Sequence, residues 1–590
     1  MDEATLARRA FTARLEHVRD HFLNRLQARL GGLAQPATAF VSQPEPKTIG
    51  SYARGRQLMA GNFLFAGYLV EAPGHSIWQI DSPTPAFEAQ IQGFGWLDDL
   101  AAVGDKKARL LAQDWLMEWI DLYGRGKGDG WLPELAGRRL IRWINHAVFL
   151  LKSLEKDRSD RFFRNLARQA RFVTKRWQSA PAGLPRFEAL TGLIYSGLAL
   201  EGCEMLVEPA MKSIADECVL RIDPDGGIPS RNPEELMETF TLLNWAASAL
   251  SEEGNMPLRP HLLAIERIAP TLRALRHADG ALARFHGGGR GQEGRLDQAL
   301  AASGVRATSV SGLAMGYSRL SAGRTSIVVD ASAPPAPQYS YNAHASTLAF
   351  ELTSGRRPII VNCGSGADFG TEWRRAGRAT PSHSTLAIEG FSSSRFAPHG
   401  VAGDSLGDLL VDGPREVRVQ QSAGLDGFSM LATHNGYAPT HGLLHVRRLD
   451  LSLDGRYLSG EDTLGALSET DRITFEALMN RTRLKGVRYD VRFHLHPDVE
   501  AEVDLGGTAI SLSLKSGEVW VFRADGADSI DLDASVYLAR GRLKPRATKQ
   551  IVLSGTVLDY SGQVSWSLSR AQDGTRHVRD LEGDDPLALI

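Results

Sequence analysis

Three polar residues with side chains that can bind metals lie beside or within successive strand-like runs in the second half of the chain. His344 precedes the run 347–352, Asn362 ends the run 358–362, and His383 precedes the run 384–389. Neighbouring strands of a sheet bring residues that are distant in sequence to one point. A neutral imidazole is a good zinc ligand, whereas an amide is a poorer one than a carboxylate. The pattern predicts either a metal site at His344, Asn362 and His383 or a metal-free cluster of hydrogen bonds.

Asn342 and His344 are separated by one residue, which is the spacing of side chains on one face of a β-strand. If the strand extends through residues 341–352, Asn342, His344 and Ser346 share one face and the residues between them share the other. We therefore expect Asn342 and His344 to lie in the same cleft.

Three tyrosines are candidates for a proton-transfer base. Tyr339 and Tyr341 precede Asn342, and Tyr195 lies in a run that predicts a helix. Nearby cations lower the pKa of a tyrosine hydroxyl, and a tyrosinate can take up a proton and return it. The sequence leaves the choice among the three open, and packing in the core is the alternative role for each.

Arginines in two segments are candidates for binding an anionic group. Arg374 and Arg378 belong to a basic run just ahead of His383, and Arg231 lies in the glycine-rich turn 225–233 next to Asn232. A guanidinium binds a carboxylate through two parallel hydrogen bonds. We predict that these arginines, together with Asn232 and Tyr195, contact the substrate. The alternatives are a solvated loop for the basic run and a helix N-cap for Asn232.

Helical periodicity dominates the first half of the chain. Apolar residues recur at spacings of three and four between short Gly/Pro turns, which predicts an α/α barrel or toroid. The predicted helices are 106–123, 138–155, 162–177, 187–204, 208–221, 234–252 and 261–275. An amphipathic pattern over residues 11–26 predicts a further helix docked on this body, with a membrane-surface helix as the alternative. The segment 277–302 is rich in glycine and predicts a linker or a long loop.

Short alternating runs replace the helices from about residue 308 onward. They are bounded by Gly, Asp, Ser and Pro, which is typical of an antiparallel sandwich. The predicted strands are 326–330, 347–352, 358–362, 384–389, 488–495, 508–514 and 518–522. The sequence thus predicts an α+β chain in three parts: an N-terminal helical extension packed on the toroid (1–92), the α/α toroid or incomplete barrel (93–305) and an antiparallel β-sandwich (306–590).

Length and composition limit the classes of function. The 590 residues are enough for at least two domains, and 43% apolar and 23% charged residues are typical of folded proteins. A formal charge of −2 gives no electrostatic case for binding nucleic acid or an anionic membrane. No run approaches the roughly 18 apolar residues of a membrane span. The three cysteines do not predict a disulfide framework.

The first thirty residues lack the apolar core and cleavage site of a signal peptide. We therefore expect a cytoplasmic location, or a periplasmic one if an export signal has been removed. The oligomeric state stays open, with a homodimer as one option.

The stretches around His344, Asn362 and His383-Ser384-Thr385 resemble strands of the heparinase II/III family of polysaccharide lyases, and the loop 225–233 resembles a loop of the same family. The resemblance implies a toroid followed by a β-sandwich, a zinc site at those three residues, and a substrate cleft between the two domains. It implies a carbon–oxygen lyase that cleaves a uronic-acid-containing poly- or oligosaccharide by β-elimination. Asn342, Tyr341, Tyr339 and Arg231 would then carry the chemistry.

The chain departs from the family pattern at three positions. Asn362 stands where relatives have an aspartate, Glu234-Glu235 where the catalytic tyrosine usually stands, and Asn342 where many relatives carry a histidine. An asparagine at position 342 could hold the substrate carboxylate but cannot be a base. These departures favour an alternative function, in which a non-catalytic carbohydrate-binding protein, or a regulator of an envelope polysaccharide, has kept the scaffold. A third alternative is a hydrolase of the α/α-barrel type.

Overall fold

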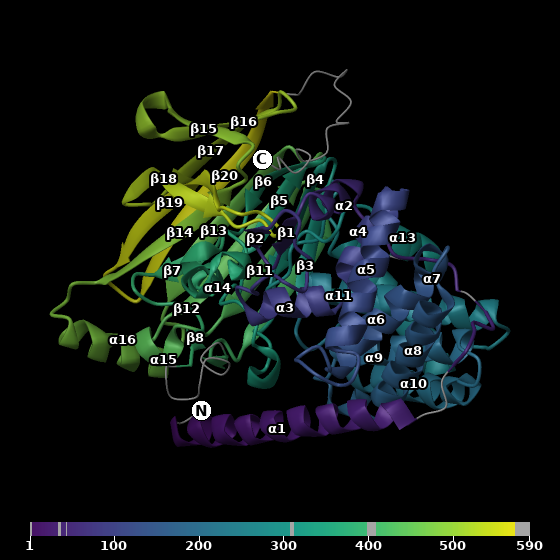
Figure 1. Cartoon of the computed structure of the whole chain (residues 1–590). Coiled ribbons are helices and arrows are strands. Elements are labelled where there is room, and N and C mark those ends of the chain that lie inside the picture. Colours follow the sequence, from purple (N-terminus) through teal and green to yellow (C-terminus); the bar gives the residue numbers. More distant parts are fainter. Residues whose placement is uncertain (1–2, 34–36, 43, 307–311, 398–408, 573–590) are drawn as a thin grey trace.

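A helical domain and a β domain lie side by side in the computed structural model, which describes residues 3–33, 37–42, 44–306, 312–397 and 409–572 (Figure 1). The predicted start of the β half near residue 308 lies outside the described residues. The last helix of the first half, α13, ends at Ala302, and the first strand of the second half, β3, begins at Tyr317. The α+β layout of a toroid followed by an antiparallel β-sandwich is confirmed.

The helical domain consists of helices that pack on one another in chain order. Helix α6 packs against α8 and α9, α9 against α10 and α11, and α11 against α12. Proline opens several helices, and Asp105 and Asn232 cap the N-termini of α5 and α11. The helices are α3 Pro85–Gln92, α4 Gly95–Val103, α5 Lys106–Leu122, α6 Pro133–Asn145, α7 Ala147–Leu151, α8 Lys156–Arg176, α9 Leu184–Ala199, α10 Val207–Arg221, α11 Pro233–Glu252, α12 Arg259–Ala274 and α13 Arg295–Ala302.

Two predictions for this half need correction. The run 138–155 forms two helices, α6 and α7, because the backbone leaves helical geometry at His146. The segment 277–302 is more than a linker, since its last part forms α13 and residues 282–288 include buried side chains against the β domain.

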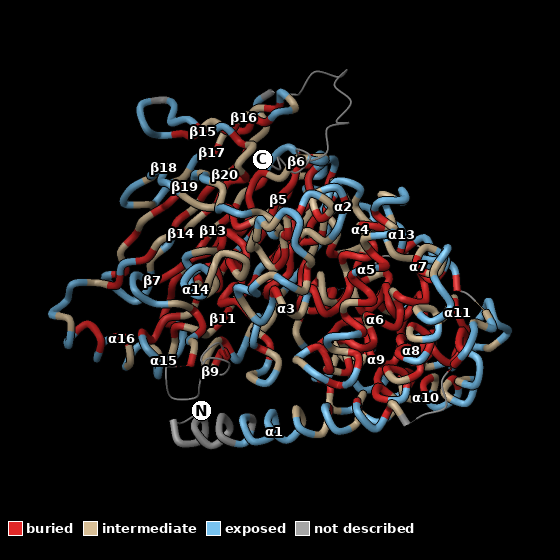
Figure 2. The backbone as a smooth tube through the Cα atoms, in the orientation of Figure 1, coloured by how far each residue is buried: buried red, intermediate tan, exposed pale blue. Residues whose placement is uncertain are grey.

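An N-terminal extension precedes the helical domain. It contains α1 Glu3–Leu30, α2 Tyr52–Met59 and a hairpin of β1 Asn62–Phe65 with β2 Tyr68–Glu71. Helix α1 contacts α8, and residues 14–30 of the helix are mostly exposed (Figure 2). Among the described residues, no helix is both long and apolar enough to cross a membrane.

The β domain contains two eight-stranded antiparallel sheets. The first has the order β18-β19-β14-β6-β5-β4-β3, with β7 also pairing with β14, and the second has the order β10-β11-β12-β13-β20-β17-β16-β15. The strands of the first sheet are β3 Tyr317–Ala322, β4 Thr325–Asp330, β5 Phe350–Ser354, β6 Arg357–Val361, β7 Leu386–Ile388, β14 Val487–Leu495, β18 Ser529–Tyr537 and β19 Arg546–Val557. Those of the second are β10 Val417–Gly424, β11 Gly427–His434, β12 Leu444–Ser452, β13 Tyr457–Gly465, β15 Val499–Asp504, β16 Ala509–Leu514, β17 Val519–Asp525 and β20 Ser561–Gln572.

Smaller elements complete the β domain. They are β8 Arg395–Phe396, β9 Leu410–Asp412, α14 Thr371–Arg378, α15 Ala438–His441 and α16 Glu469–Arg481. The β8–β9 pair forms a separate two-stranded sheet, and α15 contacts α16.

Aromatic side chains fill the space between the two large sheets. The ring of Trp566 on β20 stacks on Phe350 of β5 at 5.9 Å and lies 4.8 Å from Phe493 of β14, and Phe493 lies 5.0 Å from Phe522 on β17. Burying such rings is the main source of stability in a sandwich. This core fixes the sheet edge that faces the helical domain.

The segment 341–349 is not a strand, which corrects the prediction that Asn342 and His344 share a strand face. Regular pairing begins only at Phe350, and Leu348 has a left-handed backbone with φ of 63°. The turns before β5 bury His344 and leave Asn342 exposed. The two side chains therefore point to different environments.

The helical and β domains share one buried interface. Met315, Tyr317, Val328 and Ala349 from the β domain belong to the same apolar cluster as the helices. Buried residues lie in the interior of both domains (Figure 2). The cleft described below is thus set between two bodies with a shared packed base.

Candidate functional site

An interdomain cleft has a volume of about 1160 Å³. Its walls come from the N-terminal extension, from α4, α6, α9 and α11 of the helical domain, and from the segment between β18 and β19. Polar and charged lining residues are Thr48, Arg54, Gln57, Asn62, Gln90, Asp98, Asp99, Arg138, Arg142, Glu188, Asn232, Glu234, Glu235, Glu238, Gln292, Arg295, Asn342, Arg540, Arg542, Lys544 and Arg546.

A basic loop, residues 540–546, forms the wall on the side of the β domain. It places Arg540, Arg542, Lys544 and Arg546 in the cleft lining. Arg540 Nη1 donates to Glu234 Oε2 at 2.5 Å, and its Nη2 donates to the Gly287 carbonyl at 3.0 Å. This loop was not among the predicted site residues, although four cations in seven residues are a signal visible in the sequence.

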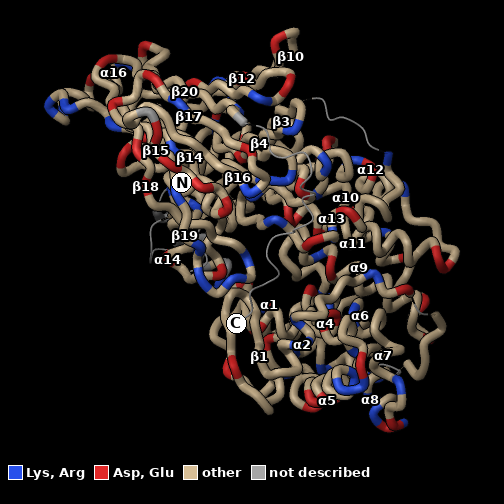
Figure 3. Tube along the Cα trace, turned by 90° about the horizontal axis from the view of Figure 1, so that it is seen from above, with Lys and Arg blue, Asp and Glu red and all other residues tan. Residues whose placement is uncertain are grey.

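An acidic wall on the helical side faces the loop. It consists of Glu188 from α9 and Glu234, Glu235 and Glu238 from α11. Figure 3 shows that acidic and basic residues are spread over both domains. Arg138 pairs with Glu188 at 2.6 Å, and Arg295 pairs with Glu238 at 2.6 Å. Burial raises the pKa of both Glu235 and Glu238.

A second pair of carboxylates, Asp98 and Asp99 of α4, lies deeper in the lining. Asp98 accepts from Arg142 at 3.0 Å and lies 2.8 Å from His146 Nε2. Asp99 accepts from the Ser51 backbone N–H at 2.7 Å, and burial raises its pKa to about 6. Asp99 can therefore exchange a proton near neutral pH.

Two of the predicted substrate contacts, Asn342 and Asn232, line the cleft. The Asn342 side-chain carbonyl accepts from Arg374 at 3.1 Å, and the Arg374 guanidinium lies 4.5 Å from the ring centre of Tyr341. Tyr341 is 48% exposed. These three residues form one cluster on the β domain. Asn232 uses its side-chain oxygen to cap α11, so the N-cap alternative also holds.

None of the three candidate tyrosines belongs to the described cleft lining. Tyr195 is buried inside α9, and burial raises the pKa of its hydroxyl rather than lowering it. Tyr339 Oη accepts from Arg221 at 3.5 Å, outside the lining. The prediction of Tyr195 as a substrate contact is wrong, because helix packing encloses the ring completely.

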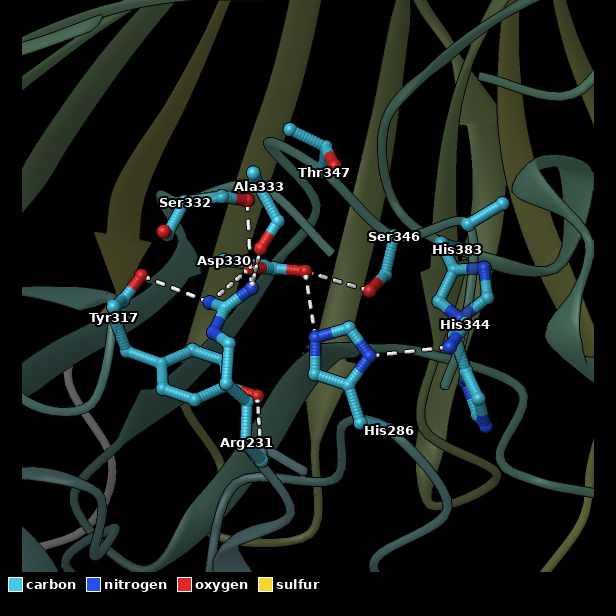
Figure 4. Close-up of polar contacts among 12 residues, drawn as sticks. Arg231, His286, Tyr317, Asp330, Ser332, Ala333, His344, Ser346, Thr347 and His383 are labelled. Carbon is cyan, nitrogen blue, oxygen red and sulfur yellow. Dashed lines mark hydrogen bonds and ion pairs between the residues drawn. The ribbon is translucent and has the colours of Figure 1, made fainter. Parts of the chain in front are cut away.

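Arg231 and Arg378, predicted to bind an anionic substrate, are buried structural residues. Arg231 pairs with Asp330 at 2.5 Å and donates to backbone carbonyls, among them Met315 at 3.1 Å and Ala333 at 2.8 Å (Figure 4). Arg378 donates to the carbonyls of Ala343 and Ser340. Both guanidinium groups bind partners inside the protein. The prediction that Arg231 and Arg378 bind an anionic substrate is therefore corrected.

A network of buried histidines continues from this ion pair. His286 Nε2 lies 3.3 Å from Asp330 Oδ2, and its Nδ1 accepts from the backbone N–H of His344 at 3.1 Å (Figure 4). Burial alone would raise the pKa of Asp330, but Arg231 and then His286 hold that pKa below its usual range. The network joins the loop before α11 to the β-domain sheet.

The predicted metal ligands His344 and His383 do meet, but as hydrogen-bond partners. His344 Nε2 accepts from the Gly287 N–H at 3.0 Å, so its Nδ1 carries the proton and donates to His383 Nε2 at 2.9 Å. His383 Nδ1 in turn donates to the Ala379 carbonyl at 2.8 Å. Burial keeps both rings neutral by lowering their pKa values, that of His383 to about 4.

This arrangement does not fit the zinc ion that the family resemblance implies. The ring lone pairs of His344 and His383 are both occupied by hydrogen bonds, and Asn362 Oδ1 accepts from the Ser384 backbone N–H at 2.9 Å. Within the described ranges, no group of three or more His, Cys, Asp or Glu could hold a metal ion. The chemistry of the site is therefore derived from the protein side chains alone.

The cleft lining limits which residues could act as the base of an elimination reaction. Among the described residues, the lining contains no tyrosine and no histidine. The groups in it that can accept a proton are carboxylates, whereas His344 and His383 are buried beneath it. The site can therefore bind an anionic, hydroxyl-rich ligand, and any acid–base chemistry in it would fall to carboxylates.

Known proteins share parts of this sequence and this architecture. Residues 305–567 match the family model described as Heparinase II/III-like, C-terminal. A crystal structure of heparinase III is 12% identical and superposes with a TM-score of 0.65, covering 90% of this chain and 88% of that one. A mutant of the heparan sulfate lyase HepC from Pedobacter heparinus is 14% identical with a TM-score of 0.57, covering 98% and 92%. At these identities the likeness shows a shared fold.

One curated relative has a name of a different kind. FtsZ-localized protein C from Caulobacter vibrioides (strain NA1000 / CB15N) is 28% identical over 531 residues, covering 88% of this chain and 88% of the relative. The similarity therefore spans both the helical and the β domain.

Proposed function

This chain is a heparinase II/III family protein, matched by the family model over its C-terminal β domain, and we propose that its interdomain cleft binds a uronic-acid-containing poly- or oligosaccharide. The basic loop carries this proposal, because it places Arg540, Arg542 and Lys544 in the lining of a cleft of about 1160 Å³. Guanidinium and ammonium groups pair with carboxylates. The amides of Asn232, Gln292 and Asn342 in the same lining suit sugar hydroxyls.

We propose further that binding occurs without cleavage. Elimination at a uronic acid needs a group to neutralise the carboxylate, a base for the C5 proton and an acid for the departing oxygen. The basic loop supplies the first group. The described lining lacks the tyrosine or histidine that would supply the others, and Glu234-Glu235 stands where the family resemblance places the tyrosine.

The likeness to FtsZ-localized protein C supports a non-catalytic role. That relative is named for a location and not for a reaction, and the similarity covers 88% of both chains. On this basis we propose that the chain acts as a regulatory protein that recognises an envelope polysaccharide.

A lyase with a carboxylate base is the second candidate, and Asp99 is the observation that favours it. Its pKa of about 6 makes it a better base at neutral pH than an ordinary aspartate. In this scheme Asp99 takes the C5 proton, the bond from C4 to its oxygen breaks, and Asp99 then gives that proton to the leaving oxygen. The product carries a double bond between C4 and C5.

One experiment separates the two candidates. Titration calorimetry with oligomers of glucuronan, alginate, heparan and hyaluronan measures binding, and the ultraviolet absorbance of the same mixtures detects unsaturated products. We expect binding without absorbance, weakened several-fold in Arg542→Gln and unchanged in the control Arg415→Gln, which lies outside the cleft lining. Absorbance that disappears in Asp99→Asn would establish the lyase instead, and no binding across the panel would refute the proposed function.

A further inference from the structure

The two walls of the cleft carry opposite charge, and the acidic wall contains one buried carboxylate oxygen without a partner among the described residues. Glu188 is 8% exposed, and its Oε1 is bound by Arg138 at 2.6 Å. Its Oε2 is buried and has no hydrogen-bond partner among the described residues. A buried carboxylate oxygen in this state costs free energy until a donor reaches it.

Glu235 lies on the same wall and is also short of positive charge. Its Oε2 accepts from the Ser230 hydroxyl at 2.8 Å, a neutral donor. Glu188 is close enough to add to the effect of burial in raising the pKa of Glu235. Two neighbouring carboxylates with one guanidinium, that of Arg138, leave this part of the cleft deficient in one cation.

The basic loop shows the complementary deficiency. Within the described part of the chain, Arg542 and Lys544 form no ion pair, although both line the cleft. Arg540 is matched by Glu234, and Arg546 by Asp498 at 3.1 Å. One wall of the cleft therefore lacks a cation and the facing wall lacks an anion.

We propose that the ligand of this cleft is a saccharide that carries both a free amino group and a carboxylate. The ammonium binds between Glu188 and Glu235, and the carboxylate binds Arg542 and Lys544. The inference rests on the proposed saccharide-binding function and narrows its ligand class, since a polyanion alone would leave the acidic wall uncompensated. The cleft exceeds the volume of about 300–1,000 Å³ typical of small-molecule pockets, so two or more sugar units fit between the walls.

Three matched oligosaccharides test this ligand class by titration calorimetry. Heparosan oligomers carry carboxylates and N-acetyl groups, their de-N-acetylated form carries carboxylates and free amines, and chitosan oligomers carry amines alone. We expect the de-N-acetylated form to bind at least ten-fold more tightly than either of the others. In Glu235→Gln, the ratio of the affinity for the de-N-acetylated form to the affinity for heparosan should fall toward one. Glu266→Gln, on the exposed face of α12, should leave this ratio unchanged.

The outcomes also separate this inference from the proposed function. If heparosan and its de-N-acetylated form bind equally well, the cleft binds uronates but the amine preference is refuted. If chitosan binds as tightly as the de-N-acetylated form, the carboxylate contact is refuted. If none of the three binds, both proposals fail together. A melting curve of each variant confirms that a lost preference does not come from unfolding.

Discussion

Arg540 and Glu234, which are 306 positions apart in the sequence, form an ion pair of 2.5 Å that joins the basic loop to the first turn of α11. The pair connects the two walls of the cleft at one point. Arg540 is 47% exposed and Glu234 is 17% exposed, so solvent screens their attraction. Its main effect is to hold the loop against the helical domain.

We predict a small, non-additive effect of this pair on stability. Glu234→Gln and Arg540→Gln should each lower the unfolding free energy by about 1 kcal/mol or less, because exposed pairs contribute little. The double variant should cost no more than the larger single change, since both remove the same contact. Urea denaturation of the four proteins measures this. Strictly additive losses would show that the two side chains act independently.

Arg231 should be far more important for stability than for ligand binding. Its guanidinium pairs with Asp330, which is fully buried, and Arg231→Met leaves that carboxylate without its cation. Removing one partner of a buried pair costs about 3–5 kcal/mol. Thermal and urea unfolding should show this loss, whereas Arg542→Met in the basic loop should change stability by about 0.5 kcal/mol or less. Equal effects of the two variants would contradict the structural role.

Acid should destabilise the protein through its buried neutral histidines, and His261 is the clearest case. Burial lowers its pKa from 6.5 to about 4, and its Nε2–H donates to the Leu243 carbonyl at 2.9 Å. Between these pH values the unfolded chain binds the proton and the folded chain does not, so stability falls as pH falls from 6.5 to 4. One such group contributes roughly 3 kcal/mol over this window.

Unfolding measured at several pH values tests the contribution of His261. The variant His261→Gln should show a shallower decline between pH 6.5 and 4 than the parent protein. Substitution of the exposed His75 should leave the slope unchanged. A slope that is the same in all three proteins would mean that His261 is protonated in the folded state.

Zinc should have no effect on the folded protein, because His344 and His383 bind each other. Elemental analysis of the purified protein should show no stoichiometric metal, and a chelator should leave the melting temperature unchanged. The variant Asn362→Asp adds the carboxylate found in the family pattern, and it is compared with the parent protein in the same metal analysis. Stoichiometric zinc in the parent protein, with a melting temperature that falls on chelation, would contradict the hydrogen-bonded arrangement.

The sequence predicted the elements better than the positions of side chains. The predicted helix 261–275 corresponds to α12 Arg259–Ala274, and the predicted strand 488–495 to β14 Val487–Leu495. Periodicity reports which face of an element is apolar, and that is enough to place it on a core. The face of Asn342 could not be predicted in this way, because turns and a left-handed Leu348 replace the strand there.

Long-range pairing explains the other differences. The sequence indicated that Arg231 binds the substrate. In the structure its guanidinium instead contacts Asp330, 99 positions later in the chain. The basic loop at 540–546 faces α11 across the cleft only after both domains have folded. Local patterns carry no information about such partners, so the sequence alone left the role of each arginine open.

Two buried tyrosines provide a final matched test of the site assignment. Tyr195, a candidate substrate contact from sequence, has a buried hydroxyl without a partner among the described residues, whereas the Tyr317 hydroxyl donates to the Arg231 carbonyl at 2.6 Å. Tyr195→Phe removes an unsatisfied polar group and should leave stability unchanged or raise it by about 1 kcal/mol. Tyr317→Phe leaves the carbonyl with one donor fewer and should lower stability by about 1–2 kcal/mol. Neither change should alter saccharide affinity, and a weaker affinity in Tyr195→Phe alone would return that tyrosine to the binding site.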